Sequence, residues 1–367
     1  MSLAVLGIGT ALPPYRYTQD EIVAVARTAS CRTADEAEIL EKLYRQTHID
    51  TRYLVHAPVL ISDIAHGTND SGTGYFSKGT DDRGPGTAER MAMYARDALP
   101  LAQEAARKAL EDASISAAAI THLVTVSCTG FSAPGFDVGL IKTLGLPAGV
   151  ERTHVGFMGC HGALNGLRVA RSFVESQPQA RVLVCAVEIS SIHYYYCWDP
   201  KRMVGNALFA DGAAALVGGP AEAGANDGWR AVTNGSCVFA DSEYAMTWSI
   251  GNHGFDMTLS AKIPNLIAAH LRPWLEQWLA SQRLTIRDIG SWAIHPGGPR
   301  VVSSVEEALG LPEKTAWASY EVLANCGNMS SPTVLFILNR LCQKNAPRPC
   351  VALGFGPGLT VEAALFD

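Results

Sequence analysis

Short apolar runs alternate with amphipathic stretches along most of the chain. Residues 3–9 (LAVLGIG) and 181–190 (RVLVCAVEIS) are continuous apolar runs of strand length, and the second is typical of a central strand in a parallel sheet. The least regular stretch, residues 56–86, is rich in Gly, Asp, Ser and Thr and predicts a long surface loop. Apolar residues at helical spacing predict helices over residues 19–28, 35–47, 87–113 (with an interruption at Pro100), 137–144, 263–282 and 299–309, and another from the Cys160 turn to about residue 176. This alternation indicates a layered α/β protein.

The chain divides into two halves with a similar plan. In each half a turn of small residues leads into a buried apolar helix, at Cys160 in the first half and at Asn328 in the second. The sequence PAEAGANDGW (220–229) separates them. We therefore predict two domains, residues 1–225 and residues 226–367.

Composition narrows the choice of partners. Hydrophobic residues make up 48% of the 367 residues and charged residues only 17%, which suits a compact enzyme or an oligomer with a large buried surface. With 29 Lys and Arg against 35 Asp and Glu, the formal net charge of −6 gives no basis for a nucleic-acid or anionic-membrane partner. No run reaches the roughly 18 to 20 apolar residues of a membrane span.

The cysteines are distributed as in a reduced protein. The nine cysteines are scattered, without a CxxC pair or a Cys/His cluster of zinc spacing, so we expect free thiols and no metal site. The amino-terminal segment lacks the basic start and the long apolar region of a signal peptide. Together these features predict a cytoplasmic protein.

One cysteine lies in a distinctive setting. Cys160 stands in VGFMGCHGALNGLRVA (155–170), where an apolar segment turns into a helix among four glycines. A thiol at a helix N-terminus faces unpaired N–H groups and the positive end of the helix dipole, which favours the thiolate. Taken alone, the pattern leaves two interpretations equally open, a reactive nucleophile or a small buried residue.

Two further polar residues lie where apolar elements end. His295 follows a strand-like run in AIHPGGPR, and Asn328 lies in CGNMSSP before an apolar helix. Each residue alone is more often a turn or capping residue than a functional one. With Cys160 they supply a nucleophile, a proton partner and an amide donor, a known combination in covalent catalysis.

The motifs around these residues resemble those of the type III polyketide synthases of the thiolase superfamily. The resemblance covers essentially the whole chain and rests on GFMGCHGALNGLRVA, LFADGAAALV, HPGG, GNMSSPTVLFIL and GFGPGLT; the cysteine segment is closer to bacterial members than to plant chalcone synthases. It implies a thiolase-like layered αβαβα fold, built from two pseudo-repeated halves, and a homodimer. It also implies iterative decarboxylative Claisen condensation of malonyl-CoA onto an acyl-CoA starter, and cyclisation to a pyrone, resorcinol or phloroglucinol-type product, without a cofactor.

The resemblance assigns a role to each residue of the set. Cys160 matches the acyl-accepting nucleophile, His295 its partner in a thiolate–imidazolium pair, and Asn328 a donor to the malonyl thioester carbonyl. Decarboxylation of a malonyl thioester produces an enolate, whose oxygen needs positioned donors, and an imidazole and an amide supply them without a metal. We expect the backbone N–H of Cys160, with one from the turn 354–358, to hold the tetrahedral oxyanion.

Other positions are expected to shape the substrate cavity. Phe209 matches an aromatic gate between the CoA tunnel and the cavity, and Met257 matches the second gate position, which is usually phenylalanine. Ala133 matches a methionine that crosses the dimer interface. The pliable side chain of Met257 predicts a looser gate, and the small side chain of Ala133 predicts room for a bulky starter. Further residues expected at the substrate site are Cys128, His193, Ser330 and Gly358, and Lys42 and Arg45 match basic residues that meet CoA phosphates.

Three other interpretations stay open at this point. A single-round β-ketoacyl synthase that uses an acyl carrier protein shares the Cys-His-Asn plan, although the initiating enzymes usually differ around the histidine and lack the GFGPG ending. A Cys-His acyl hydrolase would release free acid without forming a carbon–carbon bond. A degenerate scaffold would carry an unreactive Cys160, which the intact set of three residues argues against. The starter, the extender, the number of extensions and the cyclisation are not determined by the sequence.

Overall fold

Strands and helices alternate through the chain, as the apolar pattern predicts. The structure is a computed structural model that describes residues 2–73, 82–221 and 228–367. The first half comprises β1 (Leu3–Ala11), β2 (Tyr15–Thr18), α1 (Gln19–Ser30), α2 (Ala34–Arg45), β3 (Thr51–Leu54), α3 (Pro58–His66), α4 (Thr87–Asp112), β4 (His122–Ser127), α5 (Phe136–Leu144), β5 (Glu151–Gly156), α6 (Gly162–Ser176), β6 (Val182–Ile189), α7 (Pro200–Leu208) and β7 (Asp211–Pro220). The second half comprises β8 (Arg230–Val238), β9 (Met246–Gly251), β10 (Gly254–Leu259), α8 (Ile263–Ser281), β11 (Ser291–Ile294), α9 (Pro299–Leu309), α10 (Trp317–Cys326), α11 (Thr333–Gln343), β12 (Cys350–Gly356) and β13 (Thr360–Phe366).

A long mixed sheet connects the two halves. Within the described residues, nine strands pair in the order β11-β12-β13-β8-β1-β7-β6-β4-β5. The strand predicted over residues 181–190 is β6, which is parallel to β4 on one side and antiparallel to β7 on the other. The halves meet where β1 pairs with β8, with Leu3 opposite Ala231 and Ala4 opposite Arg230.

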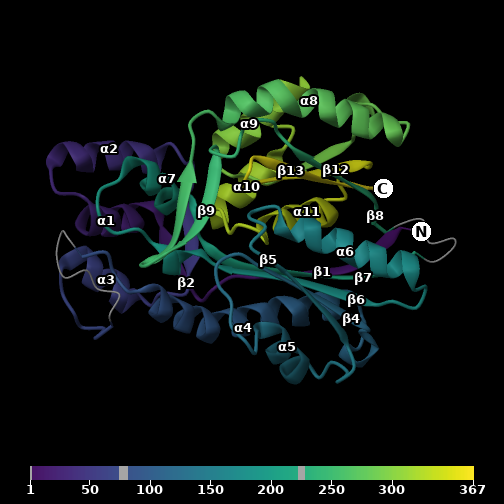
Figure 1. Ribbon diagram of the computed structural model, residues 1–367, viewed down its shortest axis with the longest axis horizontal. Helices are drawn as coiled ribbons and strands as arrows, with labels where there is room; N and C mark the ends of the chain where they lie inside the picture. Colours follow the sequence, from purple (N-terminus) through teal and green to yellow (C-terminus); the bar gives the residue numbers. More distant parts are fainter. Residues whose placement is uncertain (1, 74–81, 222–227) are drawn as a thin grey trace.

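Helices lie between the two halves of the sheet and cover both outer faces (Figure 1). Helices α6 and α11 lie between them, where Leu167 and Ile337 share one buried cluster with Val126 of β4 and Ala352 of β12. Helices α4 and α5 cover the outer face of the first half, and α8 and α9 cover that of the second. This order is the layered αβαβα arrangement that the resemblance implies. None of the helices in the described part of the chain combines the length and hydrophobicity needed to cross a membrane.

The central helix α6 approaches the sheet closely because two glycines face it. A Cβ added to Gly162 or to Gly166 would lie 2.9 Å from a methyl group of Val126 on β4. These glycines are one helical turn apart, so they present a flat stripe to the strand. The turn that precedes α6 is thereby held against the end of β4.

The stretch 56–86, predicted to be a surface loop, contains a helix. Helix α3 begins at Pro58, which suits the first helical position because its missing N–H has no partner there. Its apolar residues Leu60 and Ile64 are buried in a cluster that includes residues of α1. The remainder of the predicted loop includes residues 74–81, which lie outside the described residues.

Three further features differ from the predictions. The pattern predicts neither α10 nor the hairpin of β9 and β10. Helix α4 continues through Pro100, because this proline lies on the exposed face, where water can satisfy the carbonyl that loses its hydrogen bond.

Strand β1 and helix α4 are in very close contact at Gly9. A Cβ added to Gly9 would lie 2.2 Å from the carbonyl oxygen of Ala105 and 2.3 Å from the amide nitrogen of Ala109. Because both are backbone atoms, Gly9→Ala must push the helix away from the strand. We expect the free energy of unfolding, measured by urea denaturation, to fall by about 1–3 kcal/mol. Gly149→Ala is the control, since an added Cβ there meets nothing within 4 Å; an equal loss in both variants would contradict the close contact.

Candidate active site

Cys160 lies in a buried turn between β5 and α6. Gly159, just before it, has a φ of +85°, and an added Cβ would lie 2.4 Å from Cδ of Pro357, so this position requires glycine. The hydroxyl of Ser330 donates a hydrogen bond to Sγ of Cys160 at 3.6 Å. The thiol is therefore held between the turn before α6 and the turn before α11.

His295 follows the last residue of β11. Its backbone N–H donates to the carbonyl oxygen of Leu353 at 2.8 Å, which continues the pairing of β11 with β12. The residue is fully buried, and neither ring nitrogen has a hydrogen-bond partner among the described residues. Because an unsatisfied buried polar group is costly, this ring is suited to receive its partner from a substrate or from the nucleophile.

Asn328 is fixed by its backbone beside Phe209. Its N–H donates to the carbonyl of Leu208 at 3.0 Å, and its carbonyl accepts from the N–H of Ala210 at 2.9 Å. The side-chain Oδ1 accepts from the backbone N–H of Ser330 at 2.8 Å. With that oxygen engaged, the amide NH₂ is the group that Asn328 offers as a donor.

A cavity of about 320 Å³ brings these three residues together. Cys160, His295 and Asn328 all contribute to its walls, together with Phe209 and Met257. The three predicted catalytic residues thus come from different turns of the chain and share one space. Their individual catalytic roles stay a prediction.

Burial governs the protonation of this group. Burial raises the pKa of the Cys160 thiol to about 12, although the hydrogen bonds from Ser330 and Asn328 lower this pKa. It lowers the pKa of His295 to about 3, and the neighbouring His161 acts in the same direction. At neutral pH the resting site therefore holds a neutral thiol and a neutral imidazole. This differs from the expectation that the helix N-terminus favours the thiolate, because the helix dipole is outweighed by desolvation.

A larger cavity of about 1240 Å³, counting its open mouth, adjoins the smaller one at Cys160. Phe209 and Met257 line both cavities, and their role as gate residues stays a prediction. The larger cavity also includes the predicted residues Cys128, His193 and Ser330. Much of its remaining wall is apolar or aromatic and includes Tyr194, Tyr195, Tyr196, Trp248 and Phe255, with Ile22, Val25 and Ala29 from α1 and Leu60, Ile61 and Ile64 from α3.

Four predicted residues lie elsewhere. Within the described part of the chain, the walls of the two cavities do not include Ala133, Gly358, Lys42 or Arg45. The N–H of Gly358 points to the carbonyl of Met246 at 3.4 Å, and Ala133 is exposed in the turn before α5. Lys42 and Arg45 are exposed in the last turn of α2. The roles predicted for these four residues stay predictions.

Sequence reasoning missed a buried carboxylate beside the site. Glu188 accepts hydrogen bonds from the backbone N–H groups of Cys128 at 2.9 Å and Thr129 at 3.0 Å, and from the hydroxyl of Ser331 at 2.5 Å. It therefore ties the end of β4 to the turn that carries Asn328. Burial raises the pKa of this carboxyl group. An acidic residue inside the apolar run 181–190 was the signal in the sequence, since such a residue needs several donors.

Comparison with known proteins agrees with this architecture. Residues 2–221 match the family model for the N-terminal domain of chalcone and stilbene synthases, and residues 233–367 match the model for the C-terminal domain. The chain therefore belongs to the chalcone and stilbene synthase family. It is a type III polyketide synthase, an acyl-transferring condensing enzyme.

Curated relatives and solved structures are similar over long spans. The chain is 33% identical to 1,3,6,8-tetrahydroxynaphthalene synthase of Streptomyces peucetius subsp. caesius, over 99% of the chain and 92% of that protein. It is 35% identical to the alpha-pyrone synthesis polyketide synthase-like Pks18 of Mycobacterium tuberculosis, over 76% of the chain and 73% of that protein. The crystal structure of PKS-I from the brown alga Ectocarpus siliculosus superposes with a TM-score of 0.92 at 31% identity, covering 100% of this chain and 98% of that one.

The paired neutral groups predict a particular pH dependence of thiol reactivity. When the thiolate forms by proton transfer from Cys160 to His295, the fraction of thiolate does not change with pH between the pKa of His295 and the pKa of Cys160. We expect alkylation of Cys160 by iodoacetamide, followed by peptide mass spectrometry, to be nearly flat between about pH 5 and 9. In His295→Gln the thiolate must form by direct titration of a thiol whose pKa burial raises to about 12. Its alkylation should then be at least about tenfold slower at pH 7 and rise with pH.

The half-buried His270 on α8 provides the control for this experiment. His270→Gln removes an imidazole outside the two cavities and should leave the flat profile of Cys160 unchanged. Parallel pH profiles for the wild type and for His295→Gln would show that His295 does not take the thiol proton.

Proposed function

We propose that this chain extends an acyl-CoA starter with malonyl-CoA units by iterative decarboxylative Claisen condensation, and that the extended chain cyclises to a pyrone, resorcinol or phloroglucinol-type product. The observation that carries the proposal is the meeting of two cavities at Cys160. The larger one has room and apolar walls for an acyl chain attached to the thiol. The smaller one holds His295 and Asn328, which can bind a second thioester.

The first step is transfer of the starter to the enzyme. His295 takes the Cys160 proton, and the thiolate attacks the thioester carbonyl of the acyl-CoA. Forming both charges at once offsets part of the cost that burial imposes on each charge alone. The tetrahedral intermediate expels CoA as its thiolate, which takes the proton from the imidazolium. The products are acyl-Cys160 and free CoA, and His295 is again neutral.

The second step forms the carbon–carbon bond. Malonyl-CoA enters the smaller cavity, and its thioester oxygen accepts hydrogen bonds from His295 and from the amide of Asn328. Loss of CO₂ leaves the electron pair in the enolate, whose negative oxygen these donors stabilise. The enolate carbon then attacks acyl-Cys160, the carbon–sulfur bond breaks, and Cys160 leaves as the thiolate. The product is a β-ketoacyl-CoA that is two carbons longer.

The large cavity favours an aliphatic starter of considerable length. Beyond Cys160 its walls reach Val25 and Ala29 on α1 and Leu60 and Ile64 on α3. These residues lie in a different part of the fold from the catalytic turns, so a chain that reaches them must be extended. Apolar walls gain free energy from each methylene group that they remove from water. We therefore assign medium- and long-chain acyl-CoA as the starter class.

Exposed apolar residues beside an edge strand support a homodimer. β5 lies at the edge of the long sheet, and edge strands present unpaired backbone groups. The large side chains of Phe131, Phe157 and Met158 are exposed in the segments next to the candidate site. Pairing of two copies across this edge would cover these side chains.

Lys42 and Arg45, exposed on α2, are proposed to bind the CoA phosphates.

Two variants separate loading from decarboxylation. Cys160→Ala should abolish chain extension, because no acyl-enzyme can form. Asn328→Ala should slow the release of CO₂ from malonyl-CoA by about 100-fold, the range lost when one such donor is removed. It should nevertheless retain acyl-Cys160 in intact-protein mass spectra. Full-length product from Cys160→Ala would contradict the mechanism, and loss of loading in Asn328→Ala would make that residue a structural support.

The predicted starter class can be tested at the far wall of the cavity. Ala29→Phe should fill the space between α1 and α3. We expect it to lower kcat/KM for hexadecanoyl-CoA by at least about tenfold, because each methylene group excluded from the cavity loses about 0.8 kcal/mol of binding free energy. The kcat/KM for the shorter hexanoyl-CoA should change little. Product mass spectrometry with malonyl-CoA measures both rates. Ala24→Phe, on the exposed face of the same helix, is the matched control. Equal losses of kcat/KM for both starters would show that the acyl chain does not contact this wall.

Turnover of malonyl carrier protein in place of malonyl-CoA would favour a single-round synthase.

A further inference from the structure

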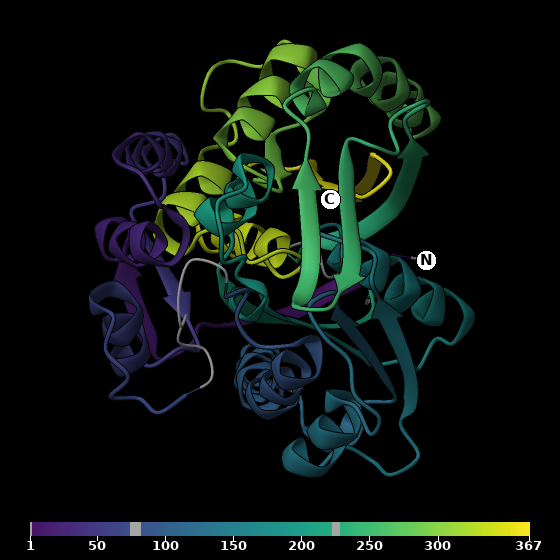
Figure 2. The same ribbon diagram turned by 60° about the vertical axis from the view of Figure 1, so that its left-hand side comes forward.

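The hairpin of β9 and β10 forms a wall between the two cavities. Its strands pair with each other and stand apart from the long sheet (Figures 1 and 2). Met246, Trp248, Phe255 and Met257 from this hairpin line the larger cavity, and Met246 and Met257 also line the smaller one. The position of the hairpin therefore decides how the cavities connect.

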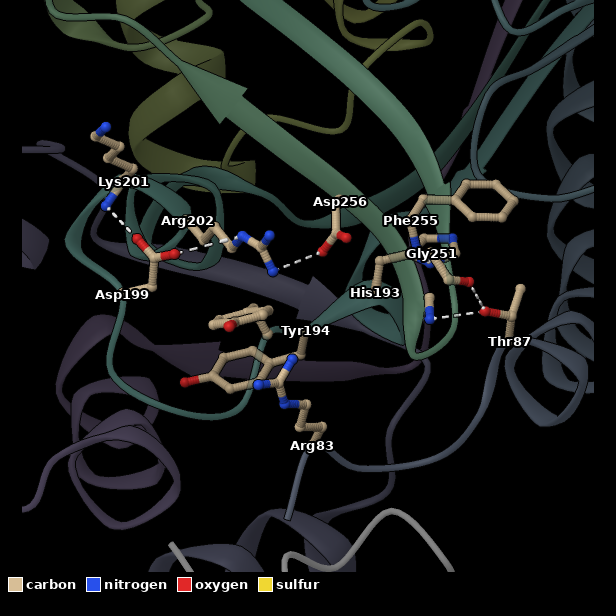
Figure 3. Close-up of polar contacts among 12 residues, drawn as sticks. Arg83, Thr87, His193, Tyr194, Asp199, Lys201, Arg202, Gly251, Phe255 and Asp256 are labelled. Carbon is tan, nitrogen blue, oxygen red and sulfur yellow. Dashed lines mark hydrogen bonds and ion pairs between the residues drawn. The ribbon is translucent and has the colours of Figure 1, made fainter. Parts of the chain in front are cut away.

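The tip of the hairpin is tied to the start of α4. Thr87 donates its backbone N–H to the carbonyl of Asn252 at 3.0 Å, and its hydroxyl oxygen accepts from the N–H of Gly254 at 3.0 Å. The same hydroxyl donates to the carbonyl of Gly251 (Figure 3). These contacts involve the backbone on the hairpin side, so they fix the tip regardless of the side chains there.

The middle of the hairpin is tied to His193. Its Nδ1 accepts from the backbone N–H of Phe255 at 2.9 Å, and its Nε2 therefore donates to the carbonyl of Thr129 at 2.6 Å. The ring stacks on Phe255 with 4.3 Å between ring centres. Burial lowers the pKa of His193 to about 3, so the imidazole is neutral. Because both nitrogens are engaged, His193 holds the wall in place rather than offering a polar contact to the substrate.

The outer edge of the hairpin is joined to α7 by an ion pair. The guanidinium of Arg202 lies 3.1 Å from Oδ1 of Asp256 and 3.4 Å from Oδ2 of Asp199 (Figure 3). It also lies over the ring of Tyr195, 4.6 Å from the ring centre. Arg202 and Asp256 both line the larger cavity. Unlike the other two ties, this one joins side chains, and about a third of each remains exposed to solvent.

The same pair connects the two elements that carry the gate. Arg202 belongs to α7, and Phe209 is the C-cap residue of that helix. Asp256 directly precedes Met257 on β10. Because adjacent residues of one element move together, a shift of β10 away from α7 separates Met257 from Phe209. The ion pair opposes that shift, so it counteracts the looser gate that the pliable side chain of Met257 predicts.

We propose that Arg202 and Asp256 form a clasp that fixes the width of the passage between Phe209 and Met257 and thereby selects narrow, linear acyl chains over aromatic ones. This inference rests on the proposed function, since it concerns which acyl groups pass from the CoA side into the larger cavity. A linear chain passes a narrow gate in an extended form, whereas an aromatic ring requires the gate to open. Breaking the clasp lowers the cost of opening and so favours the ring.

The experiment compares two starters in each variant. The ratio of kcat/KM for decanoyl-CoA to that for benzoyl-CoA is measured by product mass spectrometry with malonyl-CoA. We expect Arg202→Gln and Asp256→Asn each to lower this ratio by about two- to fivefold, the range that a partly exposed ion pair is worth. The charge-reversed pair, Arg202→Asp with Asp256→Arg, should return the ratio toward the wild-type value, because the new arginine again faces carboxylates, including Asp199.

Controls distinguish this inference from its premises. Arg272→Gln breaks a more exposed ion pair with Glu276 on α8, at 2.9 Å and away from the cavities, and should leave the ratio unchanged. If the wild type forms no condensed product from any acyl-CoA, the proposed function fails and the inference with it. If the wild type is active but both single variants keep its ratio, or the charge-reversed pair behaves like the single variants, the clasp alone is overturned.

Discussion

The placement of α6 and α11 between two half-sheets is the constraint on which the rest of the structure depends. Central helices can lie this close to the strands only where small residues face them, as Gly162 and Gly166 face Val126. The turns that begin these helices are then forced into the interior, where they meet the end of β11. A nucleophile, an imidazole and an amide on those turns are consequently buried together. The site is thus a product of the layer packing rather than of one local motif.

Deep burial determines the electrostatics of the site. An isolated thiolate or imidazolium is strongly disfavoured there, which keeps Cys160 and His295 neutral at rest. The same desolvation strengthens any hydrogen bond to a charge that develops during the reaction. The buried carboxylate of Glu188 is stabilised by hydrogen bonds from the backbone N–H groups of Cys128 and Thr129, just after β4, and from the hydroxyl of Ser331.

The extent to which the sequence predicts this structure differs between its parts. The layered fold and the three polar residues of the small cavity are predictable, because Cys160 and Asn328 precede apolar helices with clear periodicity and His295 follows an apolar strand. Helix α3 was missed because its nine residues are followed by a segment rich in Gly, Asp and Ser. The β9–β10 hairpin was missed because its two short strands belong to no apolar run. Burial, which raises the pKa of Cys160 and lowers that of His295, acts against the thiolate expected at a helix N-terminus, and it depends on contacts that the sequence alone does not show.

Two of the missed elements, α3 and the β9–β10 hairpin, form part of the walls of the larger cavity. The catalytic turns are held by the layer packing, so a change there disturbs the whole fold. Helices α1 and α3 and the β9–β10 hairpin lie outside the long sheet and are attached by local contacts such as those of His193 and Arg202. Substitutions in these attachments can alter the shape of the cavity at little cost to stability, because exposed ion pairs and single hydrogen bonds each contribute only about 1 kcal/mol. Under the proposed function, the fold therefore separates the chemistry, fixed by its core, from the choice of acyl chain, set at its periphery.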